Sequence, residues 1–480
     1  MNIKRLKNII NRSFLVILIT SFTHANFVAA QGRGISMLRD AEIEQIIRDL
    51  SEPIFEAAEL DKDSVSTYLL NDTTINAFVM GGQNVFLNSG LLLKAENANQ
   101  VIGVIAHETG HITGGHLSRF SEGMSQMTSY SLMGMLLGVA AMAAGSADAG
   151  MALMMGGQQV GYRSLLRFSR TQESSADQAG LSFLEKTGQS GRGLIEFFEI
   201  LGDQELVPEK YRDPYASTHP FNSTRIERIR DRVQESPFYE TPTDPELEQK
   251  FKLLQAKLFG YLKPLHATLV KYPVGDNSLI ARYARTFAYQ QSKNIDLALS
   301  EINGLINDYP ENPFFYETKG QMLFENGDVE QSIYPYERAV EYLPHSPLLR
   351  FSLANSLIST EKEKYLKRAI TNLEIALGDD PRNSFGWRQA SVAYHRLDDQ
   401  AMTHYATAQH FLLSGNVRGA MINAKKATDL LPKNSPKWVK AQDIMMITQS
   451  NMSDQAREAQ EKRNNQEREQ RRKERNRSIL

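Results

Sequence analysis

Cysteine is absent from this chain of 480 residues, so no disulfide bond can stabilise the fold. Stability must come instead from a buried core, from bound metal or from stacked repeats, and an oxidising compartment makes no difference to the protein. The chain also has no excess of basic residues, because it contains 54 lysines and arginines and 56 aspartates and glutamates. With a formal charge of −2, the composition gives no indication of nucleic-acid binding.

A membrane-spanning apolar run is missing from the N-terminus too. Residues 1–30 carry four basic side chains and no acid, then a short apolar run from Phe14 to Ile19, and small residues before and at Ala30. The run is shorter than the roughly 20 residues that cross a bilayer. A signal peptide cleaved after Ala30 is therefore favoured over a membrane anchor. Its removal would take the formal charge from −2 to −6, and an exported, thiol-free chain fits the bacterial periplasm.

An H-E-x-x-H pattern runs from His107 to His111, directly after the apolar and glycine residues 101–106. Residues four apart share one face of a helix, so both imidazoles can point at one zinc ion. Glu108 is then placed to take a proton from a water held there. Two surface histidines are the alternative, but imidazoles on a buried helix need a partner. Gly110 weakens the helix by about 1 kcal/mol relative to alanine, which favours a close approach to its backbone.

A catalytic zinc site needs a third protein ligand. His116 resembles the third histidine of the metzincin pattern, but that pattern requires position 117, which is Leu117. We therefore expect His116 at a helix end or in support of a ligand. Glu173 is the better candidate, because Asp177 shares its helix face and can accept the second ring N–H of a ligand histidine. A helix N-terminus rich in acids is the alternative.

Several motifs follow one another within residues 36–230: Asn76–Gly82, Asn88–Leu92, His107–His111, Glu173 with Asp177, and Ser217–Pro220. Their order resembles that of the Ste24/HtpX-type zinc peptidases, and in particular the periplasmic members with a tetratricopeptide tail. The resemblance implies that His107, His111 and Glu173 bind one zinc ion per chain and that Glu108 is the general base. It also implies that His219 is an extra ligand or a gate, and that such proteins both assist the assembly of outer-membrane β-barrels and degrade stalled ones.

His219 precedes a proline, which disfavours helix and lets the ring reach a cleft from a loop. Downstream, Arg225 and Arg228 can pair with acids near the site, although a solvated helix face is the simpler interpretation of Arg228. The short segments 66–70, 75–80 and 84–88 predict a small antiparallel sheet with a turn at Gly81 and Gly82. An edge strand beside the zinc could hold an extended peptide. Asn76 is then a substrate-binding candidate, or an ordinary residue at a strand end.

Residues 124–157 hold 8 of the 17 methionines, among many small residues. Such an adaptable apolar surface suits a lid over the active site, or contact with unfolded hydrophobic proteins or lipid. A buried helical hairpin broken between residues 143 and 150 is the alternative. A true membrane span is disfavoured by the Ser- and Gly-rich ends and by Asp148.

We expect an α+β, mostly helical chain: a signal peptide (1–30), a zinc peptidase domain (31–235), a Pro-rich linker (236–246), an all-α tetratricopeptide-like array (247–450) and a solvated or disordered charged tail (451–480). Helical periodicity predicts helices over 40–60 and 191–201. In the array, two Pro-x-x-Pro segments beginning at Pro310 and Pro344 are 34 residues apart, the tetratricopeptide period.

These observations predict a periplasmic zinc metalloendopeptidase that degrades misfolded or stalled proteins. Its repeats would bind partner proteins, including the outer-membrane β-barrel assembly machinery, and peripheral contact with a membrane is compatible with residues 124–157. The alternatives are a chaperone or scaffold in which proteolysis is secondary, and a hydrolase of cell-wall peptides.

Overall fold

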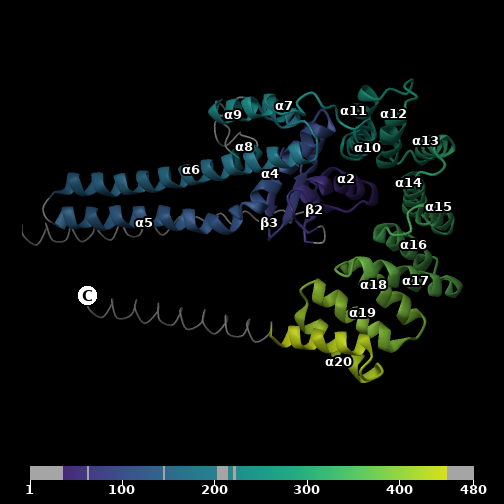
Figure 1. Cartoon of the computed structure of the whole chain (residues 1–480). Coiled ribbons are helices and arrows are strands. Elements are labelled where there is room, and N and C mark those ends of the chain that lie inside the picture. Colours follow the sequence, from purple (N-terminus) through teal and green to yellow (C-terminus); the bar gives the residue numbers. More distant parts are fainter. Residues whose placement is uncertain (1–35, 62–63, 144–145, 203–213, 220–222, 451–480) are drawn as a thin grey trace, which may run out of the picture.

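The computed structural model describes residues 36–61, 64–143, 146–202, 214–219 and 223–450. The predicted signal peptide and the charged tail lie outside the described residues. Figure 1 shows a central part with one small sheet, a long helical hairpin that projects from it, and a curved array of helices on the opposite side. The predicted α+β, mostly helical class is confirmed.

The sheet has four strands in the order β1-β2-β4-β3: β1 (Met37–Leu38), β2 (Ser66–Leu70), β3 (Ala77–Met80) and β4 (Asn84–Asn88). The β3–β4 hairpin is antiparallel and turns at Gly81 and Gly82, both with positive φ, as predicted. The expectation of a purely antiparallel sheet is wrong, because β2 and β4 pair in parallel. After the hairpin reverses the chain, β4 runs in the direction of β2. Its buried Val85 and Leu87 occupy the centre of the sheet, a position that strand periodicity does not reveal.

Helix α4 (Ala98–Thr113) is the centre of the core and carries the H-E-x-x-H pattern. Asn97 caps it by accepting a hydrogen bond from the Gln100 amide (3.0 Å). Every residue from Gln100 to Gly110 is buried, as the apolar run predicted. Helices α2 (Ala41–Ala57) and α7 (Arg192–Leu201), whose Phe197 and Phe198 are buried, pack against α4. Helix α3 (Ser89–Lys94) contributes Leu91 and Leu92 to the same core.

Helices α5 (His116–Ala143) and α6 (Ala147–Lys186) form the projecting hairpin, followed after α7 by α8 (Pro214–Thr218) and α9 (Ser223–Gln234). Helix α5 ends at Ala143 and α6 begins at Ala147, within the interval where the sequence predicted a break. The described side chains of residues 124–157 are mostly exposed, however, so the alternative of a buried hairpin there is wrong. Among the described helices, none is long and apolar enough to cross a membrane.

At its base, α6 contacts α4 backbone to backbone. A Cβ added to Gly110 would lie 2.5 Å from the carbonyl oxygen of Ala176, and one added to Gly180 would lie 2.9 Å from that of Ala106. The close approach expected at Gly110 is therefore an approach of α6. It fixes where the acidic residues of α6 lie relative to the histidines of α4.

The array consists of paired antiparallel helices that curve away from the central part and back beneath it (Figure 1). Helices α14 and α16 begin at Pro313 and Pro347, in agreement with the predicted spacing of 34, and Gly320 admits the ring of Tyr336 at 3.0 Å from its would-be Cβ. The assignment of these pairs as tetratricopeptide repeats stays a prediction. The helices are α10 (Pro245–Leu262), α11 (Leu265–Lys271), α12 (Leu279–Gln291), α13 (Ile295–Asp308), α14 (Pro313–Glu325), α15 (Val329–Tyr342), α16 (Pro347–Ser359), α17 (Glu363–Asp379), α18 (Ser384–Arg396), α19 (Gln400–Leu413) and α20 (Val417–Leu430).

Helix α10 belongs to both parts of the molecule. Phe251 and Leu254 are buried in the core around α4, whereas Leu253 and Ala256 are buried in the first cluster of the array. Its Glu248 accepts a hydrogen bond from the first amide of α4, that of Ala98 (2.8 Å). The predicted domain boundaries remain predictions. Among the described residues, however, the hydrophobic core around α4 does not end at the Pro-rich segment 236–246, because α10 contributes to it.

A buried charged cluster also joins the two parts. Lys257 of α10 lies 2.7 Å from Asp40, which caps α2, and 3.1 Å from Glu42. Tyr283 of α12 donates its hydroxyl to Glu42. Glu317 of α14 is buried beside them, and burial raises the pKa of its carboxyl to about 8. The contact between the two parts is therefore polar at its centre, and the carboxyl of Glu317 holds a proton at neutral pH.

Candidate metal centre

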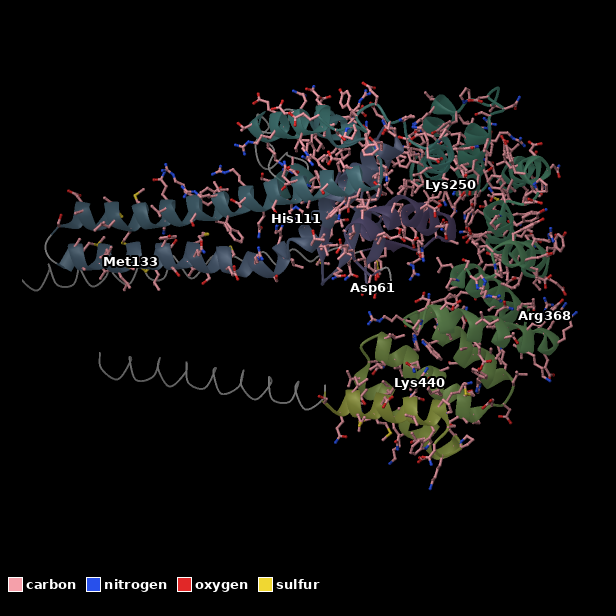
Figure 2. The ribbon with its side chains drawn as sticks, in the orientation of Figure 1. Asp61, His111, Met133, Lys250, Arg368 and Lys440 are labelled. Atoms are coloured by element: carbon pink, nitrogen blue, oxygen red, sulfur yellow. The ribbon has the colours of Figure 1, made fainter. Side chains whose placement is uncertain are left out.

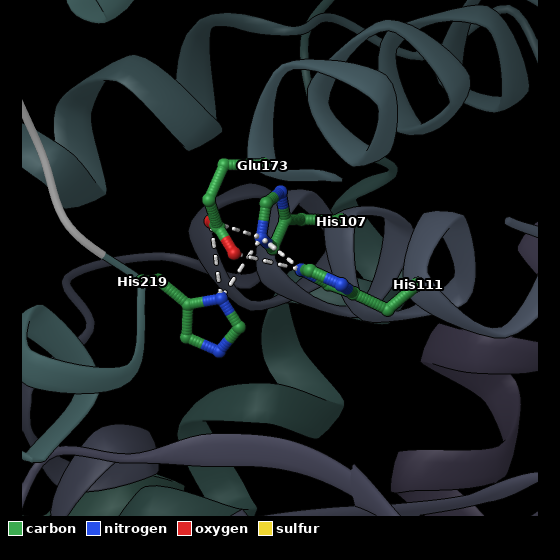
Figure 3. Close-up of side chains that lie close together, drawn as sticks. All are labelled: His107, His111, Glu173 and His219. Atoms are coloured by element: carbon green, nitrogen blue, oxygen red, sulfur yellow. Dashed lines mark hydrogen bonds and ion pairs between the residues drawn. The ribbon is translucent and has the colours of Figure 1, made fainter. Parts of the chain in front are cut away.

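Four side chains from three elements meet beside α4. His107 and His111 lie one turn apart on α4, Glu173 comes from α6, and His219 follows the short helix α8 (Figure 3). Their possible ligand atoms all lie within 4.8 Å of one another. His219 is outside helix, as its following proline predicted. Of the four, only His111 is partly exposed, so the cluster opens to solvent on that side.

The spacing of these donors fits a tetrahedral ion. The His107 and His111 Nε2 atoms are 3.0 Å apart, and each lies 3.4 Å from an oxygen of Glu173. His219 Nδ1 lies 3.2 Å from both His107 Nε2 and Glu173 Oε2. A tetrahedral zinc ion with bonds of about 2.0–2.1 Å separates its ligands by about 3.3 Å. Three imidazoles and one carboxylate therefore match zinc in chemistry and in spacing.

The ring nitrogens that point away from the cluster have partners that orient the rings. His107 Nδ1 lies 2.9 Å from Asp177 Oδ1, the arrangement that fixes the tautomer of a ligand histidine. His111 Nδ1 lies 2.9 Å from His116 Nδ1. His116 is the first residue of α5 and stands outside the four-residue cluster. The structure thus places it where the sequence suggested, at a helix end behind a ligand.

Arg225 of α9 joins the two carboxylates from behind. It donates two hydrogen bonds to Asp177, at 2.6 and 2.7 Å, and its Nη1 lies 3.0 Å from Glu173. Burial alone would raise the pKa of Asp177, but the hydrogen bonds from Arg225 and His107 outweigh it and lower that pKa. For His107, burial alone would lower the pKa of the imidazole. The hydrogen bonds and charges of Asp177 and Glu173 outweigh burial and raise that pKa to about 9. Any cation bound here competes with that proton.

Glu108 is buried beside the four donors and does not belong to them. Its Oε1 lies 3.3 Å from His219 Nε2, and burial raises the pKa of its carboxyl. A buried carboxylate with a raised pKa, next to a metal site, has the properties of a general base.

Tyr215 is a site residue that the sequence analysis missed. Its ring lies 4.6 Å from that of His219, its carbonyl accepts from the His219 amide (2.8 Å), and its own amide donates to the carbonyl of Ile75 (3.2 Å). Burial raises the pKa of its hydroxyl well above the usual value. The only sequence signal was an aromatic residue four positions before His219.

The two remaining candidates lie at the edge of this centre. Asn76 immediately precedes β3 and follows Ile75, which contacts α8; its side-chain oxygen is buried and accepts no hydrogen bond from a described residue. Arg228 is exposed, as the simpler interpretation held. It lines a cavity of about 480 Å³ that adjoins Glu173 and Asp177 and is also lined by Arg167 and Arg170.

Comparison with known proteins agrees with this geometry. Residues 37–233 match the model of peptidase family M48. The chain is 24% identical to the β-barrel assembly-enhancing protease of Yersinia pestis, over 80% of this chain and 79% of that one. It is also 24% identical to the Escherichia coli K12 protein of the same name, over 82% and 81% of the two chains. The E. coli metalloprotease YcaL is 33% identical over 35% of this chain and 60% of its own. The chain is therefore a metallopeptidase whose residues 37–233 match the model of peptidase family M48.

Proposed function

We propose that the chain is a periplasmic zinc metalloendopeptidase that hydrolyses peptide bonds in misfolded or stalled proteins. One observation carries the proposal: three imidazoles and a carboxylate lie at the spacing of a tetrahedral ion, with the buried Glu108 directly beside them. His107, His111 and Glu173 would hold the zinc. A bound zinc ion would supply positive charge that polarises the scissile carbonyl and acidifies water.

Glu108 then acts as the proton carrier. Because burial raises its pKa, its carboxylate takes the proton of the attacking water and returns it to the leaving amine. His219 lies between Glu173 and Glu108, at 3.2 and 3.3 Å. From there it can either occupy a ligand position in a latent state, as a gate, or donate a hydrogen bond to the developing oxyanion.

Strand β3 supports binding of an extended substrate. It is an edge strand that pairs only with β4 among the described strands, and it lies against α4. A peptide added to such an edge is held by main-chain hydrogen bonds, so cleavage would depend little on side chains. The buried, unpaired oxygen of Asn76 at the start of β3 is the proposed side-chain contact.

The array and the relatives support a place in outer-membrane assembly. The relatives are named β-barrel assembly-enhancing proteases and match about four fifths of this chain, a share large enough to extend into the array. Curved arrays of paired helices bind protein segments on their concave face. We therefore assign unassembled barrel proteins as substrates and the assembly machinery as a partner of the array.

Glu108→Gln tests the enzymatic part of this proposal. The mature variant should bind zinc with the stoichiometry of the wild type, one ion per chain, and should not cleave casein. Glu122→Gln, on the exposed surface of α5, is the matched control and should cleave normally. Full activity of Glu108→Gln would exclude it as the base, and wild-type protein without stoichiometric zinc would exclude the zinc site.

A scaffold with secondary proteolysis remains the competing function, favoured by the size of the array. In a deletion strain, Glu108→Gln would restore outer-membrane integrity if scaffolding suffices, and would fail if cleavage is required. His219→Ala separates its two roles: increased casein cleavage identifies a gate, whereas loss of cleavage with zinc retained identifies an oxyanion donor.

A further inference from the structure

The outer half of the α5–α6 hairpin exposes large apolar side chains. Between residues 132 and 160, eleven Leu, Met and Val side chains are at least 36% exposed, and Met133, Leu136 and Met155 are 60–65% exposed. Figure 2 shows Met133 far out on this hairpin, away from His111 at its base. A water-soluble surface does not normally carry so large an apolar area without a partner.

The apolar side chains surround the hairpin instead of forming one stripe. The two helices touch through glycine: a Cβ added to Gly134 would lie 2.5 Å from Gly157, and one added to Gly138 would lie 2.5 Å from the carbonyl of Gly150. Since small residues fill the contact, the large ones point outward. At about 100° per residue, the exposed residues from Leu132 to Val139 cover about 200° of the circumference of α5. A second copy or a folded protein would cover one face, whereas lipid surrounds the whole element.

Residue types change in order along the hairpin. The dense run of exposed apolar side chains ends at Tyr130 on α5 and Tyr162 on α6, which are 47% and 56% exposed, and of the described side chains only Met124 and Leu117 are exposed large apolar residues between Tyr130 and the start of α5. Beyond the tyrosines, towards the metal centre, follow the exposed arginines Arg119, Arg163, Arg167 and Arg170. Residues 116–172 contain only two acids: Glu122, on the metal-centre side of Tyr130, and Asp148, in the first turn of α6 at the tip of the hairpin, whose carboxylate opposes insertion. An apolar tip, followed by tyrosines and then by arginines, is the order of residue types found where a protein crosses a membrane interface with anionic headgroups.

We propose that the outer part of the α5–α6 hairpin inserts into one leaflet of an anionic phospholipid membrane. From Leu132 to Met142 the helix rises about 15 Å, half the thickness of a hydrocarbon core of about 30 Å. The arginines then meet the phosphates. From Tyr130 back to His116 the helix adds about 21 Å, so the metal centre is held above the membrane surface. At that distance from the membrane surface, the metal centre could reach segments of membrane proteins that protrude from the bilayer. The insertion needs no zinc and does not depend on the proposed catalytic mechanism.

Vesicle flotation of the mature full-length protein tests the proposal. We expect binding to vesicles of phosphatidylcholine with phosphatidylglycerol, weaker binding to phosphatidylcholine alone, and partial loss in high salt. Leu136→Asp should lower the partition coefficient about tenfold or more, since a charge in the apolar layer is strongly disfavoured. Val270→Asp, at an 82% exposed apolar position of the array, is the matched control and should bind like wild type. Glu108→Gln should also bind like wild type, which separates this test from that of the enzyme.

A second measurement reports depth. Both tryptophans of the chain, Trp387 and Trp438, lie in the array, so they can be replaced by phenylalanine and a new one placed by Met133→Trp. Its emission should shift to the blue with anionic vesicles and be quenched by brominated acyl chains. Absence of flotation, equal binding of Leu136→Asp, or a blue shift that follows protein concentration without vesicles would overturn the proposal; the last result would indicate association of two hairpins.

Discussion

Arg225 offers the sharpest test of how the metal centre is supported. In the folded chain its guanidinium is 7% exposed and bridges Asp177 and Glu173 at 2.6–3.0 Å. Arg225→Met keeps most of the side-chain volume and removes the charge. It would leave two buried carboxylates close together, with only the histidines as counter-charge.

Breaking a buried ion pair by removing one partner typically costs about 3–5 kcal/mol, because the remaining charge stays desolvated. We expect a value in that range for Arg225→Met. In the native chain Arg225 holds the pKa of Asp177 below its usual range. In the variant that pKa should rise, and Asp177 should orient the ring of His107 less firmly. Zinc binding should therefore weaken together with stability. Arg228→Met, three residues further along α9 and exposed, is the matched control and should change stability by less than about 0.5 kcal/mol.

The assay must report on the peptidase part alone, since both tryptophans lie in the array and global unfolding of a two-part chain need not be two-state. Hydrogen exchange with mass spectrometry on peptides from α4 and α6 meets that need. We expect Arg225→Met to accelerate exchange there about a hundredfold or more, as 3 kcal/mol implies. If exchange changes no more than in Arg228→Met, the bridge from Arg225 to the two carboxylates does not support the metal centre.

Three further predictions follow from other contacts. Asp177→Asn should weaken zinc binding about 10- to 100-fold, because it weakens the orientation of His107, and competition with a chromogenic chelator would measure this; unchanged affinity would contradict it. Gly110→Ala places a methyl group 2.5 Å from the backbone of α6 and should lower the free energy of unfolding by about 1–3 kcal/mol, seen as a lower melting temperature. Glu317, with a pKa of about 8 in the folded chain and an ordinary value of 4.5, holds a proton that the unfolded chain releases between those values. Stability is thus expected to fall by at most about 5 kcal/mol as pH rises through that interval, and thermal melts of Glu317→Gln should lose part of this slope.

Local patterns were enough to predict the helices that carry the site. The apolar run before His107 indicated a buried helix, and the pairing of Glu173 with Asp177 indicated where a second helix would approach it. The structure brings these residues together, with His219 as the fourth member of the cluster. The roles assigned to them stay predictions, since geometry alone does not show which group moves a proton.

Other features depended on information that no local pattern contains. Strand periodicity showed three strands but not that β4 lies parallel to β2, because neighbour order depends on how the hairpin docks. The Met-rich segment has the same composition whether its side chains are buried or exposed, so only the structure shows Leu136 facing outward. Tyr215 lies within an unremarkable stretch, and it becomes a site residue only because α8 docks beside Ile75.

The shared position of α10 has a consequence for dissecting the protein. A fragment that stops at residue 235 would leave holes where Phe251 and Leu254 now fill the interior, and the first turn of α4 would lose the carboxylate of Glu248. Such a fragment should aggregate, and a nick in the segment 236–244 should leave the two pieces associated. Helix α10, 18 residues long, thus links the array directly to the start of the helix that carries His107.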